Sequence, residues 1–333
     1  SIYERFFNSN SVNKSYKKYL LEFSKQFKSG LHYERSMSYT SQLLHESFLV
    51  FQAHINETPA DHIALIEKSL GLINFYKKIG LKVDFVDNIF EQSFQEKNLC
   101  SLYTRVFKKN LLEKGSSSPT ENNNYVTIFN KKFAVCADCG FPSPSFQPGH
   151  AHDSSGAIEL SFKSNPIFIS GNVSTYENCH QRNIERSRFN YSKITSEGIF
   201  QDVWSSFRVA KRVKPKKIFN KSEINFSIAS GAQGFSRKAI INDDQVSIID
   251  NTLGSEPLVS QFILSTNCRV LFNNDSDIII DNNSSKLKIT STNSIAIEDL
   301  EIPTGYGMIE YTKIIKIVSN NKLNILKIME ICS

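Results

Sequence analysis

The sequence predicts an α+β protein of more than one domain, in which a helical domain precedes a large antiparallel β domain. Three observations predict it. Apolar residues first recur at helical spacing, a short polar segment follows, and the remainder consists of short runs rich in Val, Ile and Phe. A chain of 333 residues that is 40% hydrophobic is long enough for about two domains, each with its own core.

The helical domain is predicted for residues 1–114. From Tyr16 to about Leu112 the apolar residues follow helical spacing, as in YKKYLLEFSKQF and YTSQLLHESFLVFQAHI. We expect one break at 56–61, where a proline stands before Asp61 as the helix N-cap, and another near Gly80.

A linker is predicted for residues 115–124, because GSSSPTENNN is small, polar and proline-containing. Residues 125–333 then predict an antiparallel β-sandwich, since each apolar run is bounded by Asn, Gly, Ser or Asp. The expected strands are YVTIF, FAVCA, AIELSF, SFRVAKRV, EINFSI, QVSIID, FILS, RVLF, DIIID, KLKIT, SIAIED and IIKIVS.

The charge and hydropathy of the chain limit its partners. A formal net charge of +6 favours an acidic partner, whether nucleic acid, anionic lipid or acidic sugar. No run approaches the ~20 apolar residues of a membrane-spanning helix, and the first residues lack the apolar core of a signal peptide. We therefore expect a soluble piece without a membrane span, and the compartment stays open.

The six cysteines are too widely spread for a small disulfide framework. Cys136 and Cys139 form a CxxC, a spacing that can hold zinc or carry redox chemistry. There is no second close pair, and the alternation of Phe133, Val135 and Ala137 is typical of a strand. This pattern favours two ordinary small strand residues.

The segment PSFQPGHAHDSSGAIELSF, residues 144–162, is the most informative for chemistry. His150 and His152 would project to the same side of an extended backbone, and Pro148 with Gly149 predicts a turn before them. Spacing alone fits two surface histidines on a loop equally well.

The context of this motif resembles the heparinase II/III-like polysaccharide lyases. ADCGFPSPSFQPGHAH followed by AIELSF is similar to the segment that opens their β domain, and IERSRFNYSK, DVWSSFRVAKRVKP and SRKAIINDDQVSIIDNTLG match later segments in the same order. Upstream, GLHYERSMSY and KVDFVDN resemble segments of the family's helical domain. The resemblance spans most of residues 20–250.

The resemblance implies a partial (α/α) toroid followed by the β-sandwich, with the active site in the cleft between them. It also implies an enzyme, a carbon–oxygen lyase that cleaves a uronate-containing acidic polysaccharide by β-elimination. In that reaction a base removes the C5 proton, the charge developing on the carboxyl group is neutralised, and an acid protonates the leaving oxygen at C4. The family resemblance points to the periplasm or bacterial cell envelope, and the cytoplasm stays open.

Residue by residue, Tyr39 matches the catalytic tyrosine and His150 the catalytic histidine. From pattern alone, Tyr39 reads as a buried aromatic residue on a helix. The resemblance further suggests five substrate-binding residues, although arginines in a loop are more often simply solvated: Glu34, Arg35, Arg186, Arg188 and Asn190.

The matched positions depart from the family at its structural zinc. Family members use the second histidine of HxH, here His152, together with an aspartate and a histidine. Ser170 and Phe189 stand at the latter two positions, so we expect no zinc and no other cofactor. Nearby side chains that could in principle substitute are Asp153, Cys179 and His180.

The toroid is short, because only about forty residues precede Tyr39. The chain could be a fragment, associate with an N-terminal toroid segment or with itself, or be a non-catalytic relative that serves in carbohydrate binding or assembly. Nucleic-acid binding would rest only on the basic residues of 211–217, which lack a stacking platform, so we expect none. Glycoside hydrolysis needs two distinguished carboxylates, and nothing singles out a pair among Glu34, Asp87 and Asp153.

Overall fold

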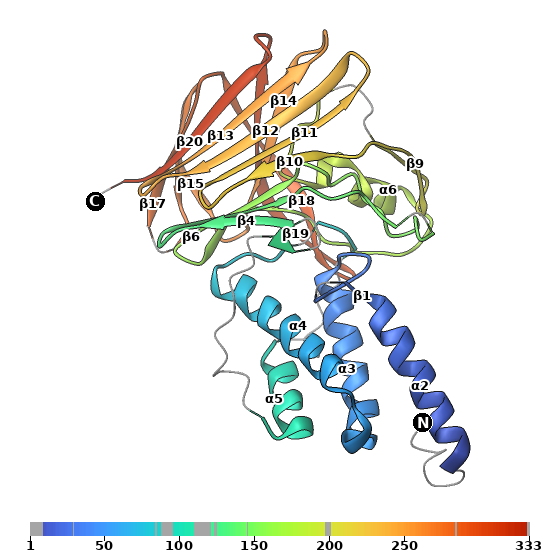
Figure 1. Cartoon of the computed structure of the whole chain (residues 1–333). Helices are drawn as coiled ribbons and strands as arrows, with labels where there is room; N and C mark the ends of the chain where they lie inside the picture. The colour runs from blue at the N-terminus through green and yellow to red at the C-terminus, as the bar shows by residue number, and fades with distance from the viewer. Residues whose placement is uncertain are drawn as a thin grey trace. The chain divides into compact units, whose positions relative to one another are not determined.

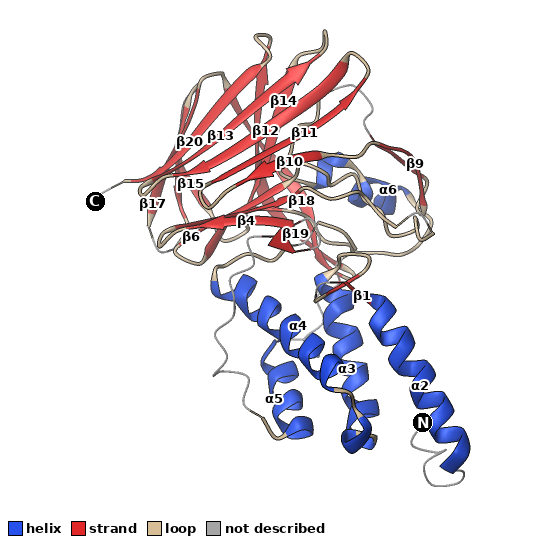
Figure 2. Ribbon diagram, in the orientation of Figure 1, coloured by secondary structure: helices blue, strands red, loops and turns tan. Residues whose placement is uncertain are grey.

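The structure is a computed structural model, and its chain divides into two compact units. The first unit consists of Ser1–Phe75 and Phe90–Asn123, the second of Tyr76–Ile89 and Asn124–Ser333. Figure 2 shows helices in the first unit and mainly strands in the second. The described residues are 9–28, 30–83, 85–87, 96–109, 121–122, 125–144, 146–196, 201–283 and 285–331.

The predicted linker, residues 115–124, lies outside the described residues except for Glu121–Asn122, which form the short strand β3. The same holds for the parts of the predicted helical stretch at residues 88–95 and 110–112. Within the described part of the chain, no helix is both long enough and apolar enough to cross a membrane.

The first unit is a group of packed helices, as the helical spacing predicts. Helix α3 begins after its N-cap Ser36, whose side chain accepts a hydrogen bond from the backbone N–H of Tyr39. Helix α4 begins at Ala60, so Asp61 lies in its first turn and the prediction of Asp61 as the N-cap is wrong. The elements are α2 (Ser9–Gln26), β1 (Phe27–Lys28), β2 (Leu31–His32), α3 (Met37–Ala53), η1 (Ile55–Glu57), α4 (Ala60–Lys78) and α5 (Glu96–Phe107).

Apolar side chains from all four helices form the core of this unit. Phe23 of α2, Phe51 of α3, Leu70 of α4 and Leu99 of α5 are all essentially inaccessible to solvent. Each such side chain contributes about 1.5–3 kcal/mol by leaving water. The apolar spacing that predicts the helices therefore also predicts the apolar helix faces that pack together in this core.

The second unit contains two large antiparallel sheets (Figure 1). The strand order in one is β10-β11-β12-β13-β20-β17-β16-β15, and in the other β18-β19-β14-β7-β6-β5-β4-β3. The strands are β4 (Tyr125–Phe129), β5 (Phe133–Asp138), β6 (Ile158–Phe162), β7 (Asn165–Ile169), β10 (Lys216–Phe219), β11 (Glu223–Ser230), β12 (Gln233–Ile241), β13 (Gln245–Leu253), β14 (Leu258–Leu264), β15 (Arg269–Asn273), β16 (Asp277–Asp281), β17 (Lys286–Ser291), β18 (Ile295–Gly305), β19 (Met308–Ser319) and β20 (Leu323–Glu330).

The core of the second unit draws on both sheets, so the predicted α+β fold with a β-sandwich is confirmed. Phe226 of β11 and Ile248 of β13 belong to the same buried cluster as Leu160 of β6 and Ile315 of β19. Residues alternate between this core and the other face of the sheet, as in β11. Outside the sheets lie the hairpin of β8 (Gln201–Trp204) and β9 (Arg208–Arg212), the helix α6 (His180–Arg186) and the short turn η4 (Arg188–Asn190).

One segment of the predicted helical range, 76–89, belongs with the β unit. The buried carboxylate of Glu159 on β6 accepts hydrogen bonds from the backbone N–H groups of Lys82 (3.1 Å) and Val83 (2.7 Å). The ring of Phe85 packs beside that of Tyr125, with centroids 5.3 Å apart. These contacts place Asp87, two residues further on, among the loops of the β unit.

Candidate active site

The loop that carries the two histidines is anchored at both ends by Asp138, the last residue of β5. Its carboxylate accepts hydrogen bonds from the Gly140 backbone N–H (2.9 Å) and the Ser154 hydroxyl (2.7 Å). The backbone N–H of Ala151 donates to the Pro148 carbonyl at 3.1 Å, so the turn predicted before the histidines is present. The loop is thus held in one conformation by protein groups.

Both histidines face the carboxylate of Asp87. His152 is fully buried, and its Nε2 lies 2.5 Å from Oδ1 of Asp87. The side chain of His150 is 29% exposed, and its Nε2 lies 4.0 Å from Oδ2 of the same carboxylate. The two histidines therefore do lie together, one inside the protein and one at its surface.

Arg182 and Tyr191 complete this network. The guanidinium of Arg182, on α6, donates to both oxygens of Asp87 at 2.6 and 2.8 Å, which is the bidentate geometry of a strong ion pair. The hydroxyl of Tyr191 is hydrogen-bonded to Nδ1 of His152. All four side chains of the Asp87 network, namely Asp87, His152, Arg182 and Tyr191, are inaccessible to solvent.

The protonation states of the network follow from its surroundings. Burial raises the pKa of Asp87, but His152 and Arg182 outweigh burial and hold that pKa well below its ordinary value. Burial lowers the pKa of His152 to about 4, although Asp87 acts in the opposite direction. Near neutral pH, Asp87 is therefore ionised and His152 is neutral, donating from Nε2 to Asp87 and accepting at Nδ1 from Tyr191, whose own pKa is raised by burial.

Arg186, predicted to bind an acidic sugar, contacts the protein interior. It is fully buried, and its guanidinium donates to the carbonyls of Ala151 (2.9 Å) and Ser205 (2.7 Å). Two further carbonyls, of Pro148 and Arg208, lie at 3.4 and 3.3 Å. The donors of Arg186 thus hold backbone carbonyls around the histidine loop, and its contact with substrate stays a prediction.

Asn190 and Arg188 have different environments. The Asn190 amide donates to the backbone carbonyls of Glu185 (2.9 Å) and Asn172 (3.2 Å). Asn190 was predicted to hydrogen-bond either substrate or backbone, and these contacts are with the backbone. Arg188 is partly exposed and donates to the Ser196 carbonyl at 3.0 Å. Of the two arginines, only Arg188 reaches the surface.

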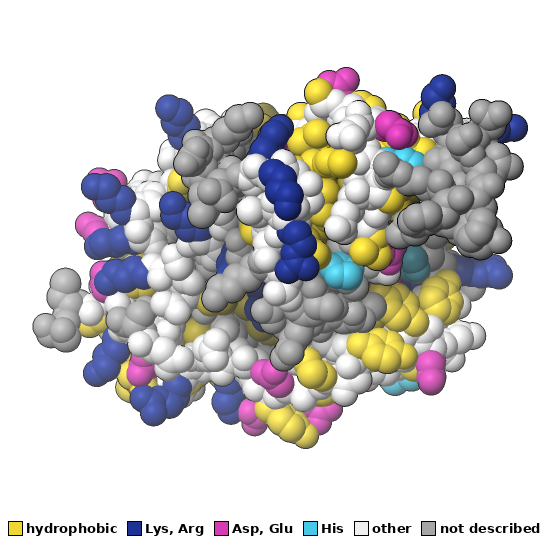
Figure 3. Space-filling model, turned by 90° about the horizontal axis from the view of Figure 1, so that it is seen from below, with side chains coloured by type: hydrophobic (Ala, Val, Ile, Leu, Met, Phe, Trp, Pro, Cys, Tyr) yellow, Lys and Arg dark blue, Asp and Glu magenta, His cyan; other side chains and the backbone are white. Residues whose placement is uncertain are grey.

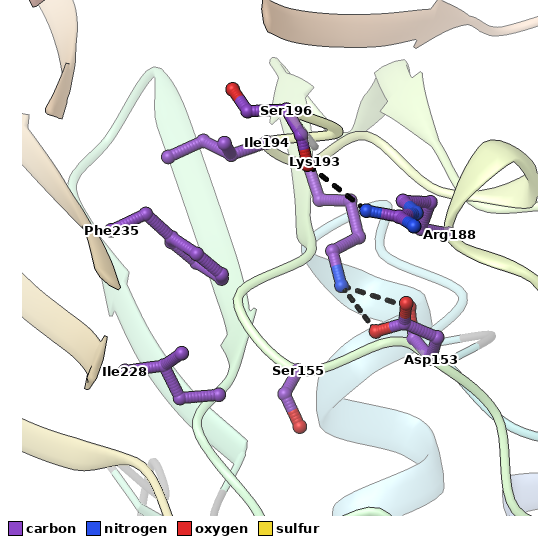
Figure 4. Close-up of a pocket in the computed structure, with 8 residues that line it drawn as sticks. All are labelled: Asp153, Ser155, Arg188, Lys193, Ile194, Ser196, Ile228 and Phe235. Carbon is purple, nitrogen blue, oxygen red and sulfur yellow. Dashed lines mark hydrogen bonds and ion pairs between the residues drawn. The ribbon is translucent and has the colours of Figure 1, made fainter. Parts of the chain in front are cut away.

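A small recess opens beside Arg188 (Figure 4). One side is polar, with the buried Lys193 amine donating to the carboxylate of Asp153 at 2.8 Å. The other side is formed by Ile228 and Phe235. Burial lowers the pKa of Lys193, and Asp153 opposes that shift. Asp153, one of the residues that could have bound a metal, thus neutralises a buried lysine.

The residues that match the family's zinc positions do not fit zinc. Both ring nitrogens of His152 have protein partners, and Phe189 has no ligand atom and is 56% exposed. Cys179 and His180 lie at the start of α6. Within the described ranges, no group of three or more His, Cys, Asp or Glu side chains is placed to hold a metal ion.

Of the two CxxC cysteines, predicted to be strand residues, only Cys136 lies in a strand. Cys136 is in β5, and Cys139 follows its end. Both are buried free thiols, and burial raises the pKa of Cys136 well above its ordinary value. A thiol of this kind is a poor nucleophile.

Tyr39 lies in the first unit, in the first turn of α3, and is partly exposed. Its ring meets that of His32 edge-on, with centroids 5.7 Å apart. Glu34 and Arg35 lie in the same segment and are both buried. Arg35 has a left-handed backbone (φ 69°), a conformation that costs a non-glycine residue about 1–2 kcal/mol and often marks a functional segment.

Glu34 has a partner within this segment. Burial and the neighbouring carboxylate of Glu34, which shares a hydrogen bond with the Tyr33 hydroxyl, together raise the pKa of Tyr33 to about 12. The tyrosine and histidine predicted as catalytic thus belong to different compact units, and each unit brings its own polar residues around one of them.

Basic side chains lie at several separate places on the face of the molecule in Figure 3. The sequence cluster at 211–217 is divided between β9 and β10. Arg212 packs over the ring of Phe141 at 5.0 Å and donates to the Ser143 carbonyl at 3.3 Å. One member of the cluster is therefore used in a contact within the protein.

Sequence reasoning missed His32, Arg182 and Tyr191. The arginine and tyrosine follow no recognised spacing, and they reach Asp87 and His152 only through the fold. Asp87 was weighed only as a hydrolase carboxylate and as part of a matched segment. The one usable signal was its place directly after the apolar run FV, where a buried carboxylate requires a partner.

Two solved structures illustrate the likeness of this fold to known proteins. A heparan sulfate lyase, HepC from Pedobacter heparinus, matches with a TM-score of 0.70 and 16% identity, over 93% of this chain and 54% of that one. A heparinase III with methylated lysines matches with a TM-score of 0.71 and 14% identity, over 96% of this chain and 55% of that one. The chain therefore spans about half the length of these proteins. No curated protein sequence matches it.

At the level of class, then, this is an α+β protein with the fold of these lyases. Residues 114–318 match the family model described as heparinase II/III-like, C-terminal. The chain belongs to the heparinase II/III-like family, and the resemblance noted in its motifs is confirmed.

Proposed function

We propose that this protein is a polysaccharide lyase that cleaves a uronate-containing acidic glycan by β-elimination, with Tyr39 and His150 as its acid–base pair. The observation that carries the proposal is the position of His150. Its partly exposed ring lies 4.0 Å from an ionised carboxylate that a buried arginine holds in place. A histidine so oriented, at the family's catalytic position, is suited to proton transfer.

The reaction demands three groups. A base takes the proton at C5, the electron pair forms the C4–C5 double bond, and the C4–O4 bond breaks while an acid protonates the leaving oxygen. The C5 proton is weakly acidic, so positive charge or hydrogen-bond donors must stabilise the enolate-like intermediate. Arg188, a partly exposed arginine close to Asn190 and Tyr191 in sequence, is our candidate for a cation that attracts the acidic sugar.

Asp87 supports proton transfer by His150 in two ways. Its negative charge favours the imidazolium that forms when His150 accepts a proton, and the bidentate contact with Arg182 fixes the direction of that charge. Asp87 is buried and does not itself reach a substrate. We therefore assign it as a positioning residue.

Tyr39 lies in the first turn of α3, the end of the helix at which the macrodipole is positive. The backbone N–H of Tyr39 also donates a hydrogen bond to Oγ of the N-cap Ser36 at 3.0 Å, which fixes the backbone there. These features suit a tyrosine that exchanges a proton during the reaction.

The alternative proposal is a non-catalytic relative that binds or assembles carbohydrate. It is favoured by the zinc positions, where Ser170 and Phe189 replace ligands. For either function we propose the periplasm or cell envelope as the place of action, on the family resemblance.

The test is the ultraviolet absorbance of a C4–C5 unsaturated uronate, measured with heparan sulfate, chondroitin sulfate, hyaluronan and alginate as substrates. We expect Tyr39→Phe and His150→Ala to lower the rate about 10²–10⁴-fold. The matched controls Tyr311→Phe and His180→Ala alter exposed residues of the same types and should keep the wild-type rate. No absorbance change with any substrate, from a folded protein, would favour the non-catalytic alternative.

A further inference from the structure

An aromatic surface lies beside His150 in the β unit. The ring of Tyr176 meets the His150 ring nearly edge-on, with centroids 6.1 Å apart. The ring of Tyr306 lies nearly parallel to that of Tyr176, at 24° and 6.4 Å. Tyr306 is 59% exposed, so most of its ring is available for contact with a ligand.

The position of Tyr306 is built into the fold. It occupies the turn between β18 and β19, where Gly307 has φ +67° and allows the tight reversal. The backbone N–H of Gly307 donates to the Ser174 carbonyl at 2.8 Å. Asn172 donates from its backbone to the Pro303 carbonyl (2.8 Å) and from its side chain to the Thr304 carbonyl (2.9 Å). The turn is thus tied to the segment that leads to Tyr176.

Arg182 connects this surface to the Asp87 network. Its guanidinium lies over the ring of Tyr176 at 5.0 Å and over that of Phe207 at 5.7 Å, while its donors hold Asp87. The same arginine therefore fixes the carboxylate behind His150 and one aromatic ring beside it. A rigid aromatic surface next to a catalytic group is a suitable place to hold a substrate in register.

We propose that Tyr306 and Tyr176 form a stacking subsite for a pyranose ring of the glycan, next to the residue cleaved at His150. The C–H groups on the face of a sugar ring pack well against aromatic rings, and a tyrosine ring contributes contact area at a low entropic cost. The subsite selects for a sugar ring and is indifferent to its charge. This inference deepens the proposed lyase function and rests on it.

The experiment measures binding separately from turnover. The full chain with Tyr39→Phe, which should bind without cleaving, is titrated by calorimetry with heparan sulfate, chondroitin sulfate and hyaluronan oligosaccharides. We expect Tyr306→Ala to weaken binding about tenfold, and Tyr306→Phe to leave binding unchanged because it keeps the ring. Phe272→Ala is the matched control, since Phe272 is an exposed aromatic residue (49%) of the other sheet.

The outcomes separate this inference from the lyase proposal. The stacking subsite would be overturned if Tyr306→Ala bound the oligosaccharides as tightly as the Tyr39→Phe chain that still has Tyr306. It would also be overturned if Tyr306→Phe lost as much affinity as Tyr306→Ala, or if the Tyr39→Phe chain bound none of the oligosaccharides. The chain with its native Tyr39 could bind oligosaccharides through the Tyr306 ring and yet give no absorbance change. That result would support the stacking subsite and overturn only the lyase proposal. Unfolding curves should agree for all variants, because the Tyr306 side chain is mostly exposed.

Discussion

Asp87 shows how one buried carboxylate organises side chains from distant parts of the chain. It joins His152, Arg182 and His150, which lie 63 to 95 residues further along the sequence. A buried charge is tolerated only with partners of this kind, and removing one partner from a buried ion pair costs about 3–5 kcal/mol. The network therefore couples the stability of the β unit to the position of His150.

The depressed pKa of His152 predicts a loss of stability in acid. Its pKa in the folded protein is about 4, below the ordinary 6.5, so the unfolded chain binds this proton first as the pH falls. The free energy of unfolding should therefore fall by about 2 kcal/mol from this group between pH 7 and pH 5. Urea unfolding at both pH values measures it.

The comparison uses His152→Gln, which keeps two hydrogen-bonding groups but does not titrate, and His180→Gln, which changes an exposed histidine. The pH dependence should flatten only in His152→Gln. An unchanged slope in that variant would mean that His152 titrates normally in the folded protein.

For single residues, the sequence predicts local motifs better than it predicts which groups a side chain contacts. The HxH histidines were found because their spacing and the preceding turn are local features. The contacts of Arg186 with four backbone carbonyls could not be predicted, because an arginine at the end of a helix looks the same in sequence whether it faces solvent or carbonyl groups. Such pairings depend on contacts between segments, and single-sequence patterns do not contain them.

Among the elements, strands bounded by turn residues were predictable and several others were not. All twelve expected runs lie in or overlap strands of the β unit. The pattern missed β7, whose run begins Asn-Pro, as well as β8, β10 and β12. It also missed β20, whose sequence LNILKIME is as compatible with a helix as with a strand. β20 is a strand because its neighbours β13 and β17 supply its hydrogen bonds.

Two glycines near the end of α4 predict opposite effects of the same substitution. A Cβ at Gly80 would lie 2.1 Å from the Ser164 carbonyl oxygen, and φ there is +73°. Gly80→Ala should therefore lower the free energy of unfolding by about 2–4 kcal/mol. Gly71 lies inside α4, and a Cβ would meet nothing within 4 Å, so Gly71→Ala should raise it by about 1 kcal/mol.

Denaturant unfolding of both variants beside the wild type provides the measurement. Each glycine serves as the control for the other, because the added atom is identical. Destabilisation by Gly71→Ala, or tolerance of Gly80→Ala, would show that the backbone around the respective glycine differs from the one described.

For the molecule as a whole, we predict that folding does not depend on zinc. His152 stands at a position where the family binds zinc, but both of its ring nitrogens are hydrogen-bonded within the protein, to Asp87 and Tyr191. Purified protein should contain far less than one zinc per chain by mass spectrometry of its metals, and excess EDTA should leave the melting temperature unchanged. One zinc per chain, with a melting temperature lowered by its removal, would contradict this prediction.

The position of β20 has a consequence for how the β unit is made. Strands β10 to β13 form one ribbon and β15 to β17 another, and within the described residues β20 joins them by pairing with both. During synthesis these ribbons leave the ribosome with β13 and β17 as open edges, and the strand that closes them emerges after every other strand described. Until then each edge can pair with another nascent chain. We expect this interval to be the most aggregation-prone stage in the life of the protein, and a chaperone that covers strand edges would act there.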